Sequence, residues 1–301
     1  MKLLITGATG DVGSKVVRQL LSEGYRLRLF VRDAARARAL FGDGVELCIG
    51  DLADPVSLQT ACRGTEAAFL VSSGPGIPVL DSMMAAAARN ESLRLVVKLS
   101  SLDAQENLAI GSWHAQGEAA IHAAGIPFTF VRPTGFMSNL LAWAPSIQAE
   151  GVVRSSTGNG RRPFIHSADI ASVVVRCLTS DAYIGQCLAI TGPEALSFPE
   201  ITSRIGRQLG QTLRFESISD EEAARRFLAT GASHEETAAH VELWRAIRED
   251  RLATVTDGVV QILGREPLPL QTWLAENLAA FYEPVFHPSQ HSRQGPGCPV
   301  S

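Results

Sequence analysis

A glycine loop between an apolar strand and an amphipathic helix is the feature that most constrains how this chain folds. Residues 3–5 form a short apolar run, and Gly7-x-x-Gly10-x-x-Gly13 follows it directly. Residues 14–21 then carry apolar side chains at helical spacing. In this order the first glycine permits a tight turn, the second lets backbone N–H groups approach a pyrophosphate, and the third lets helix and strand pack closely. The alternative is a glycine turn that only tightens a strand-to-helix connection.

The helix after this loop adds to the case for a dinucleotide site. Its N-terminus offers unpaired N–H groups and a partial positive charge to an anion. We therefore expect the phosphates of a nucleotide to lie on the loop. The residues expected to contact the cofactor there are Gly7, Thr9, Gly10, Asp11, Val12 and Gly13.

The end of the second predicted strand indicates which dinucleotide binds. Residues 25–31 form this strand, Arg32 and Asp33 follow it, and Arg36 and Arg38 lie on the next helix. A site that prefers NAD commonly has a carboxylate here, on the ribose 2′-hydroxyl, whereas an arginine can pair with the 2′-phosphate of NADP. Arg32 therefore favours NADP(H), with NAD(H) as the alternative. Asp33 lies one position late for the NAD role and is a candidate helix cap.

Further short apolar strands alternate with helices along the first half of the chain. They are predicted at residues 45–51, 67–71, 93–101 and 127–133. This alternation predicts a Rossmann-type α/β fold, a doubly wound parallel sheet with helices on both faces. Ligands bind at the carboxyl ends of such strands. The cofactor contacts expected at these ends are Asp51, Leu52, Ser72, Ser100, Pro133 and Thr134.

The composition excludes several classes of protein. Of the 301 residues, 46% are hydrophobic and 19% are charged, which is typical of an ordinary globular chain. The net charge of −4 and the lack of a basic stripe argue against nucleic acid, and no apolar stretch is long enough for a bilayer. The five scattered cysteines indicate reduced thiols in a cytoplasmic protein. We expect a small-molecule substrate, no metal, no nucleic-acid or membrane partner, and a monomer or homodimer.

An ordered set of motifs resembles the NmrA-like group of atypical short-chain dehydrogenases/reductases. The set spans about residues 1–285. Its blocks are Thr6-Gly7-Ala8-Thr9-Gly10-x-x-Gly13, Val31-Arg32-Asp33, Gly50-Asp51-Leu52, Lys98-Leu99-Ser100-Ser101, His114-x-x-x-Glu118, and residues 131–139, 166–171 and 188–197. The resemblance implies an NAD(P)-binding domain and a smaller C-terminal substrate domain. The group includes quinone and azo-dye reductases, tailoring enzymes of secondary metabolism, and non-catalytic redox sensors.

These observations together divide the chain into parts. Residues 1–150, with a returning segment at about 163–195, are expected to form the Rossmann domain. A smaller α+β part is expected over 196–285. Residues 286–301 are rich in Pro, Gly, Ser, Gln and His, which is typical of a disordered tail.

The catalytic prediction rests on one helix. Typical short-chain dehydrogenases carry Tyr-x-x-x-Lys after a serine at the end of a strand. This chain has Ser100 and Ser101 at the position of that serine. At the positions of the Tyr and the Lys it has His114 and Glu118. The i,i+4 spacing places both side chains on one helical face, where a carboxylate would orient the imidazole and raise its pKa. His114 is thus a candidate proton donor. The alternative is a structural pair beside hydride transfer that needs no side-chain acid.

Aromatic and apolar residues predict where a substrate binds. Phe136, Met137 and Trp143 follow the last of these strands at helical spacing, which is typical either of a core-facing helix or of a pocket for a flat apolar molecule. For His166 a structural role is the alternative to a pocket role. The candidate substrate contacts are Trp113, Phe136, Met137, Asn139, Trp143, Phe164 and His166.

The leading functional hypothesis is an NADPH-dependent oxidoreductase that reduces a small apolar, aromatic or heterocyclic compound. A quinone, ketone, enone or imine fits this description, and a tailoring step of secondary metabolism is one setting for it. A second hypothesis is a non-catalytic regulator that senses NADP(H), and a weaker third is an isomerase or epimerase with bound cofactor. The aromatic residues favour a substrate pocket, whereas the missing Tyr and Lys favour the sensor.

Overall fold

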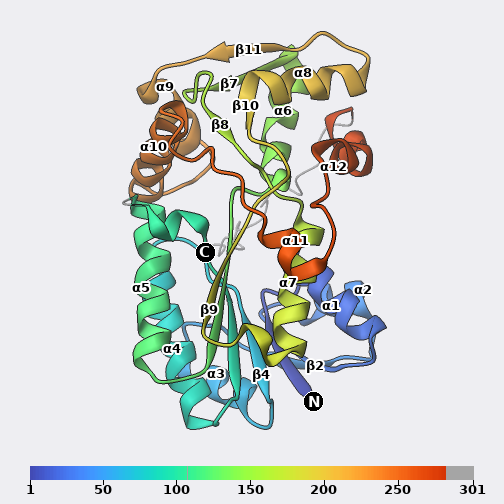
Figure 1. Cartoon of the computed structure of the whole chain (residues 1–301), viewed down its shortest axis with the longest axis vertical. Helices are drawn as coiled ribbons and strands as arrows, with labels where there is room; N and C mark the ends of the chain where they lie inside the picture. Colours follow the sequence, from blue (N-terminus) through green and yellow to red (C-terminus); the bar gives the residue numbers. More distant parts are fainter. Residues whose placement is uncertain (107, 283–301) are drawn as a thin grey trace, which may run out of the picture.

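The computed structural model describes residues 1–106 and 108–282. Its lower part in Figure 1 is a sheet between two layers of helices, and its upper part contains shorter strands and helices. The sheet has seven strands in the order β3-β2-β1-β4-β5-β6-β9, and every pairing is parallel. The order reverses between β1 and β4, as in Rossmann-type folds. The predicted fold class is therefore confirmed.

Strands β2 to β6 fall within the ranges predicted for them, and β1 extends the predicted run of residues 3–5 by one residue at each end. Residues 100 and 101, expected in the fifth strand, leave the sheet because the Ser101 side chain caps a short 3-10 helix, η1 (Leu102–Gln105). The observed strands are β1 (Lys2–Thr6), β2 (Arg26–Val31), β3 (Glu46–Ile49), β4 (Ala67–Leu70), β5 (Leu95–Leu99), β6 (Phe128–Pro133) and β9 (Gln186–Ile190).

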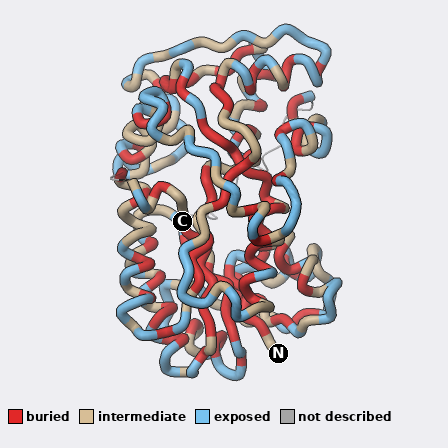
Figure 2. The backbone as a smooth tube through the Cα atoms, in the orientation of Figure 1, coloured by how far each residue is buried: buried red, intermediate tan, exposed pale blue. Residues whose placement is uncertain are grey.

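Two apolar clusters cover the two faces of the sheet. One joins the sheet to α1 (Asp11–Ser22), α2 (Ala34–Phe41), α7 (Ser167–Thr179) and α11 (Gly258–Leu263). The other joins it to α3 (Pro55–Cys62), α4 (Ile77–Asn90) and α5 (Ala109–Ala123). Figure 2 shows the buried residues following the sheet and the helix sides that face it. Central strands buried on both faces explain why their sequences are continuous apolar runs.

The upper part has a core of its own. It contains residues from about 137–164 together with residues from 196–281, so two separate stretches of chain build it. Strands β7 and β11 pair in parallel, and β8 and β10 pair antiparallel. Its elements are η2 (Met137–Trp143), α6 (Ala144–Glu150), β7 (Val152–Ser155), β8 (Arg161–Arg162), β10 (Leu196–Ser197), α8 (Phe198–Leu209), β11 (Arg214–Ser217), α9 (Asp220–Leu228), α10 (His234–Arg248), α12 (Leu270–Asn277) and η4 (Leu278–Phe281).

Helix caps form where local sequence predicts them. Asp33 and Asp54 accept backbone N–H groups at the starts of α2 and α3, and Ser197 forms a capping box with Glu200 at α8. Each cap requires only residues within one helical turn, so no tertiary contact is needed to form it. The expected helix over Phe136–Trp143 is a 3-10 helix, and α6 then begins with Pro145 in its first turn.

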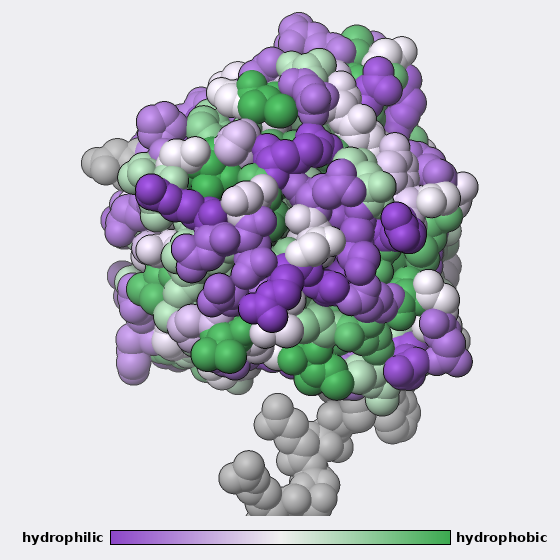
Figure 3. Space-filling model, turned by 90° about the horizontal axis from the view of Figure 1, so that it is seen from below, coloured by the Kyte–Doolittle hydropathy of each residue, from purple (hydrophilic) through white to green (hydrophobic). Residues whose placement is uncertain are grey.

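The outer surface and the remaining residues add little to the site. The face at the bottom of Figure 1 is hydrophilic over most of its centre, with hydrophobic side chains in separate groups (Figure 3). Within residues 1–106 and 108–282, none of the helices has the length and apolar character needed to cross a membrane. The expected tail, residues 286–301, lies outside the described residues. The predicted domain boundaries stay predictions.

A glycine in α1 provides a test of how this fold is held. A Cβ atom on Gly13 would lie 2.1 Å from the carbonyl oxygen of Gly7, which is backbone and cannot rotate away. We expect Gly13→Ala to lower the free energy of unfolding by about 1–3 kcal/mol, the usual effect of overpacking. Urea denaturation measures this change. Gly44→Ala is the matched control, since a Cβ there meets no atom within 4 Å, and an equal effect in both variants would contradict the close approach.

Candidate functional site

The glycine loop forms an open cradle at the carboxyl end of β1. Gly7 adopts a left-handed conformation with φ +61°, and its carbonyl oxygen accepts the N–H of Gly10 at 3.0 Å. No side chain caps the start of α1. A Cβ on Gly10 would meet only the Gly7 oxygen, at 3.3 Å, so the outer side of Gly10 is free of protein. An open loop with unpaired helix N–H groups fits the pyrophosphate of a dinucleotide.

Asp11, the first residue of α1, uses its carboxylate within the protein. Lys15 and the Ser167 hydroxyl both donate hydrogen bonds to it. Burial alone would raise the pKa of Asp11, but hydrogen bonds from Lys15, Ser167 and Ser138 hold it below its ordinary value. The carboxylate thus ties α1 to the start of α7, and the predicted cofactor contact of Asp11 is left to its backbone N–H.

Two arginines flank the loop at the end of β2. Asp33 caps α2 by accepting the N–H of Arg36, and the Arg36 side chain donates to the Thr9 carbonyl at 3.3 Å. Arg32 is exposed and makes no ion pair or hydrogen bond with any of the described residues. Arg38 points elsewhere and pairs with Asp43. Sequence reasoning placed Arg32 in the site but left Arg36 out of its contacts, although its position one turn into α2 was the available signal.

The other predicted cofactor positions lie where the parallel strands end. The Asp51 carboxylate accepts the N–H of Ala53 at 2.9 Å, and Leu52 packs partly against the core. Two side chains are engaged by protein groups: the Ser72 hydroxyl donates to Asp81 at 2.6 Å, and the Thr134 hydroxyl accepts from Arg162 at 3.3 Å. Pro133 pairs with Ile190 of β9. These positions border one edge of the sheet, as expected. Because several of their side chains are already engaged by protein groups, they present mainly backbone groups to a ligand.

Glu118 does not pair with His114 as the helical spacing predicted. Its carboxylate accepts the Ser100 hydroxyl at 2.5 Å and the Nε of Arg132 at 2.9 Å, and a second Arg132 nitrogen binds its other oxygen. Arg132 lies on β6, so the ion pair joins that strand to α5. The expected His114–Glu118 pair is therefore wrong, because a guanidinium from the adjacent strand occupies the carboxylate.

The environment of His114 also reverses the expected direction of its pKa shift. Burial and the positive charge of Lys98 lower the pKa of His114 from 6.5 to about 3. The ring is consequently neutral near physiological pH and is not an imidazolium acid. In the unfolded chain this histidine takes up a proton near its ordinary pKa, so protonation at this residue favours unfolding as pH falls from about 6.5 toward 3.

A buried ion pair that sequence reasoning missed lies beside this histidine. Lys98 of β5 and Asp81 of α4 are both fully buried, with Nζ and Oδ2 2.5 Å apart. Burial lowers the pKa of Lys98, and the adjacent carboxylate opposes that shift. A lysine inside the apolar run of residues 95–99 was the signal, since such a residue is rarely buried without a partner.

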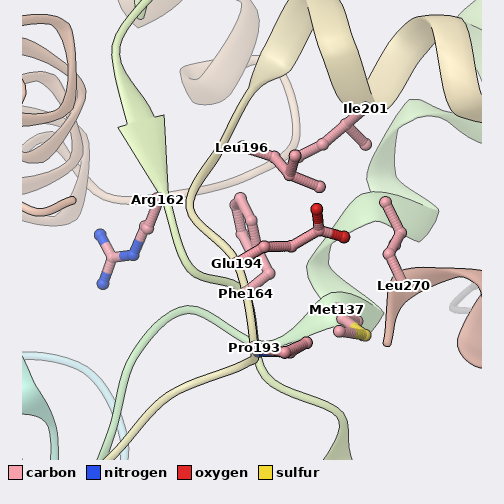
Figure 4. A pocket seen from close by; sticks show the side chains of 8 residues that line it. All are labelled: Met137, Arg162, Phe164, Pro193, Glu194, Leu196, Ile201 and Leu270. Carbon is pink, nitrogen blue, oxygen red and sulfur yellow. The ribbon is translucent and has the colours of Figure 1, made fainter. Parts of the chain in front are cut away.

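The predicted substrate residues do not converge on one pocket. Trp143 and Phe164 both contact the ring of Phe198, with centroids 5.0 and 5.8 Å away, in the core of the upper part. Met137 and Phe164 border a cavity of about 10 Å³, room for about one water molecule (Figure 4). The Arg162 side chain on its rim turns away from the other labelled side chains and binds Asp103.

The remaining candidates have separate environments. Trp113 lines a groove of about 410 Å³ between α5 and α10, apart from the core of the upper part. His166 caps α7 through its Nδ1 and lies 3.1 Å from Glu276 through its Nε2, which is a structural role. Phe136 is partly buried against the sheet core, and Asn139 is exposed. Within the described ranges, no group of three His, Cys, Asp or Glu side chains could hold a metal ion.

Comparison with known proteins identifies the family. The profile of the NmrA-like family matches residues 1–250. The chain belongs to the NmrA-like family. A relative from Streptomyces griseus, a (4-alkanoyl-5-oxo-2,5-dihydrofuran-3-yl)methyl phosphate reductase, is 37% identical and covers 93% of this chain and 99% of its own. The NAD(P)H azoreductase of Xenophilus azovorans is 32% identical, with 93% and 99% covered. The family resemblance predicted from the motifs is confirmed.

Solved structures of similar fold agree with this assignment. The NADPH complex of the NADPH-dependent quinone oxidoreductase from Escherichia coli aligns with a TM-score of 0.82, at 22% identity, and covers 93% of this chain and 100% of that one. At this identity the likeness concerns the fold of this NmrA-like chain. It extends beyond the parallel sheet into the upper part, since the coverage is nearly complete.

The open side of Gly10 predicts a separation between binding and stability. Gly10 has φ −83°, which alanine adopts without strain. We expect Gly10→Ala to lower the free energy of unfolding by no more than about 1 kcal/mol, because only the Gly7 oxygen, 3.3 Å from the new Cβ, must shift slightly. We expect it to weaken NADPH binding at least about tenfold, because the new methyl group occupies the space that the pyrophosphate must approach. Calorimetric titration and urea denaturation measure the two effects. Unchanged affinity in the folded variant would place the nucleotide elsewhere.

Proposed function

We propose that this NmrA-like protein is an NADPH-dependent oxidoreductase that reduces a small, conjugated, largely apolar acceptor. The observation that carries the proposal is the open glycine loop with two arginines beside it. The cradle lies where the parallel strands end. The loop matches the pyrophosphate of the cofactor, and Arg32 and Arg36 match its 2′-phosphate. The names of the relatives, which include NAD(P)H and NADPH reductases, support the same interpretation.

The cofactor preference follows from charge. Arg32 lacks a protein partner among the described residues, and Arg36 is held over the loop by the Thr9 carbonyl. Together they present two guanidinium groups where the 2′-phosphate of NADPH is expected. An arginine forms charge-assisted hydrogen bonds to a phosphate and has nothing comparable to offer a ribose hydroxyl. NADPH is therefore the preferred cofactor, with NADH bound more weakly.

The acceptor class is inferred from the site and from the relatives together. The names of those relatives specify a dihydrofuranone phosphate, azo compounds and quinones. All three are conjugated acceptors that take a hydride and hold the resulting charge on oxygen or nitrogen. The groove beside Trp113 has a volume typical of small-ligand sites and is lined mainly by α5 and α10. We place the acceptor between this groove and the strand ends, next to Ser100 and His114.

Removing one guanidinium tests the cofactor assignment. We expect Arg32→Ala and Arg36→Ala each to weaken NADPH binding by about 1.5–3 kcal/mol, the usual value of a hydrogen bond to a charged group, while NADH binding changes little. Fluorescence titration with both cofactors measures the difference. Arg38→Ala is the matched control, since its guanidinium pairs with Asp43 just after the same helix. Equal losses for NADPH and NADH would show that these arginines do not bind the 2′-phosphate.

Turnover separates the enzyme from a sensor. We expect NADPH oxidation with at least one member of a panel of enones, quinones and azo compounds, and a slower rate with NADPH deuterated at C4, because the hydride then transfers as deuteride. Gly10→Ala serves as the control that weakens cofactor binding without unfolding the protein. Tight NADPH binding with no oxidation by any acceptor would favour the NADP(H)-sensing regulator instead.

A further inference from the structure

A layer of buried polar groups lies between the apolar core and the carboxyl edge of the sheet. Lys98 lies on β5, and Ser100 lies just after the end of this strand. The two residues are two positions apart, so their side chains point to the same face of the sheet, toward α4 and α5. Arg132 of the adjacent strand faces the same way and binds Glu118 of α5. In Figure 1 these strands run upward beside α4 and α5, which cover them on that side. The layer thus lies directly below the place proposed for the acceptor.

Lys98 has more donors than partners in this layer. An ammonium group carries three N–H donors. One binds Asp81 at 2.5 Å, and a second lies 3.4 Å from the Ser72 hydroxyl. Since Lys98 is fully buried, bulk water cannot satisfy the third donor. A buried donor without an acceptor is destabilising by about 1–3 kcal/mol, so an acceptor close to Nζ is expected.

The same ion pair lies against the helical face that carries His114. A Cβ on Gly117 would be 2.0 Å from the Asp81 carboxylate, so that carboxylate touches the helix at Gly117. His114 precedes Gly117 by three residues and lies on the same face, one turn away. The charge of Lys98 acts on the His114 ring over this short path. The Lys98–Asp81 pair and the imidazole therefore lie against the same face of α5.

The buried ring nitrogen of His114 is a candidate for this acceptor. Its Nδ1 is buried and has no hydrogen-bond partner among the described residues. Of the other buried side-chain atoms in that condition, those of Asp81 and Asp169 each face a cation, and the remaining one is the Ser156 hydroxyl. Nε2 also lacks a partner within the part of the chain that the structure describes but is not among the buried atoms, so it is open to solvent. A neutral imidazole has one acceptor nitrogen and one donor nitrogen. The buried nitrogen beside an ammonium is the acceptor, and the open nitrogen then carries the proton.

We propose that Lys98, held by Asp81, is a positioning residue that fixes the Nε2–H tautomer of His114, with Nδ1 accepting from Nζ through one water molecule. Two carboxylates near this face are already engaged. Glu118, on the same helix, is bound by Ser100 and Arg132, and Glu242 of α10 accepts the N–H of Ala109 at the start of α5. Neither carboxylate is available to draw the proton to Nδ1.

The catalytic consequence rests on the proposed function. NADPH supplies a hydride that forms a new C–H or N–H bond on the acceptor, NADPH becomes NADP⁺, and the displaced π electron pair moves to the acceptor oxygen or nitrogen. His114 then donates a hydrogen bond from Nε2–H to that atom and keeps its own proton, since losing it would leave an imidazolate. Water supplies the proton that completes the product. The ring is thus a neutral electrophile of the kind that a lowered histidine pKa permits.

The experiment records ¹⁵N NMR signals of the His114 ring in the full chain without cofactor or acceptor. His114→Gln assigns the signals. We expect a neutral ring with the proton on Nε2 throughout about pH 5 to 8, where an ordinary histidine changes its charge. In Lys98→Met/Asp81→Asn both charges are removed, and the oxygen of the introduced amide can still accept from Ser72. There we expect both tautomers, a His114 pKa that rises from its wild-type value but stays below 6.5, because the ring is still buried, and a turnover rate at least about tenfold lower.

A second pair of substitutions separates this effect from general destabilisation. Asp169→Asn/Arg265→Met removes another ion pair with a fully buried carboxylate, at 2.7 Å and at the start of α7. It is expected to leave the His114 signals as in the wild type. A proton on Nδ1 in the wild type, an imidazolium near neutral pH, or an unchanged tautomer in Lys98→Met/Asp81→Asn would each overturn the proposal. Absence of turnover with every acceptor would instead count against the proposed function alone, because the NMR measurement needs none.

Discussion

Pairing of buried charges at the carboxyl edge of the sheet is the constraint on which the site depends. Lys98 with Asp81 joins β5 to α4, and Arg132 with Glu118 joins β6 to α5. A third pair, Arg162 with Asp103, joins β8 of the upper part to the short helix after β5. Removing one partner from a buried pair is destabilising by about 3–5 kcal/mol, because the remaining charge is left without compensation. Each element around the candidate site is therefore held by a contact that tolerates little displacement.

The sequence was sufficient for the fold because the signals for the fold are local. The apolar runs, the glycine loop and the caps at Asp33 and Ser197 involve residues within one or two turns of each other. The partners of Glu118 and Lys98 could not be found in the same way. Arg132 is close to Glu118 only because β6 lies next to β5, and Asp81 reaches Lys98 only because Gly117 leaves room between α4 and α5. Helical spacing instead suggested His114 as the partner of Glu118. His114 is the nearest candidate along the helix, but in the folded chain Arg132 is the partner.

The aromatic residues after β6 show a second limit of pattern reasoning. Helical spacing of Met137 and Trp143 is equally typical of a core and of a pocket, since both bury apolar side chains. The deciding residue, Phe198, lies more than fifty residues later and fills the space against Trp143 and Phe164. Helical spacing alone therefore could not tell these core residues from the lining of a substrate pocket. Trp113, predicted for the same pocket, faces α10 instead, because α5 turns that side of the helix away from the upper core.

A neutral layer of this kind also bears on which acceptors suit the site. The buried pairs cancel each other, and His114 adds a dipole and no net charge at neutral pH. Negative charge that develops on an acceptor is then met by N–H dipoles, which stabilise it less than a full positive charge placed beside it. Acceptors whose reduced form already delocalises the negative charge over a conjugated system need the least stabilisation by the protein. The replacement of Tyr and Lys by His114 and Glu118 is consistent with such acceptors, because a strong side-chain acid would contribute little to their reduction.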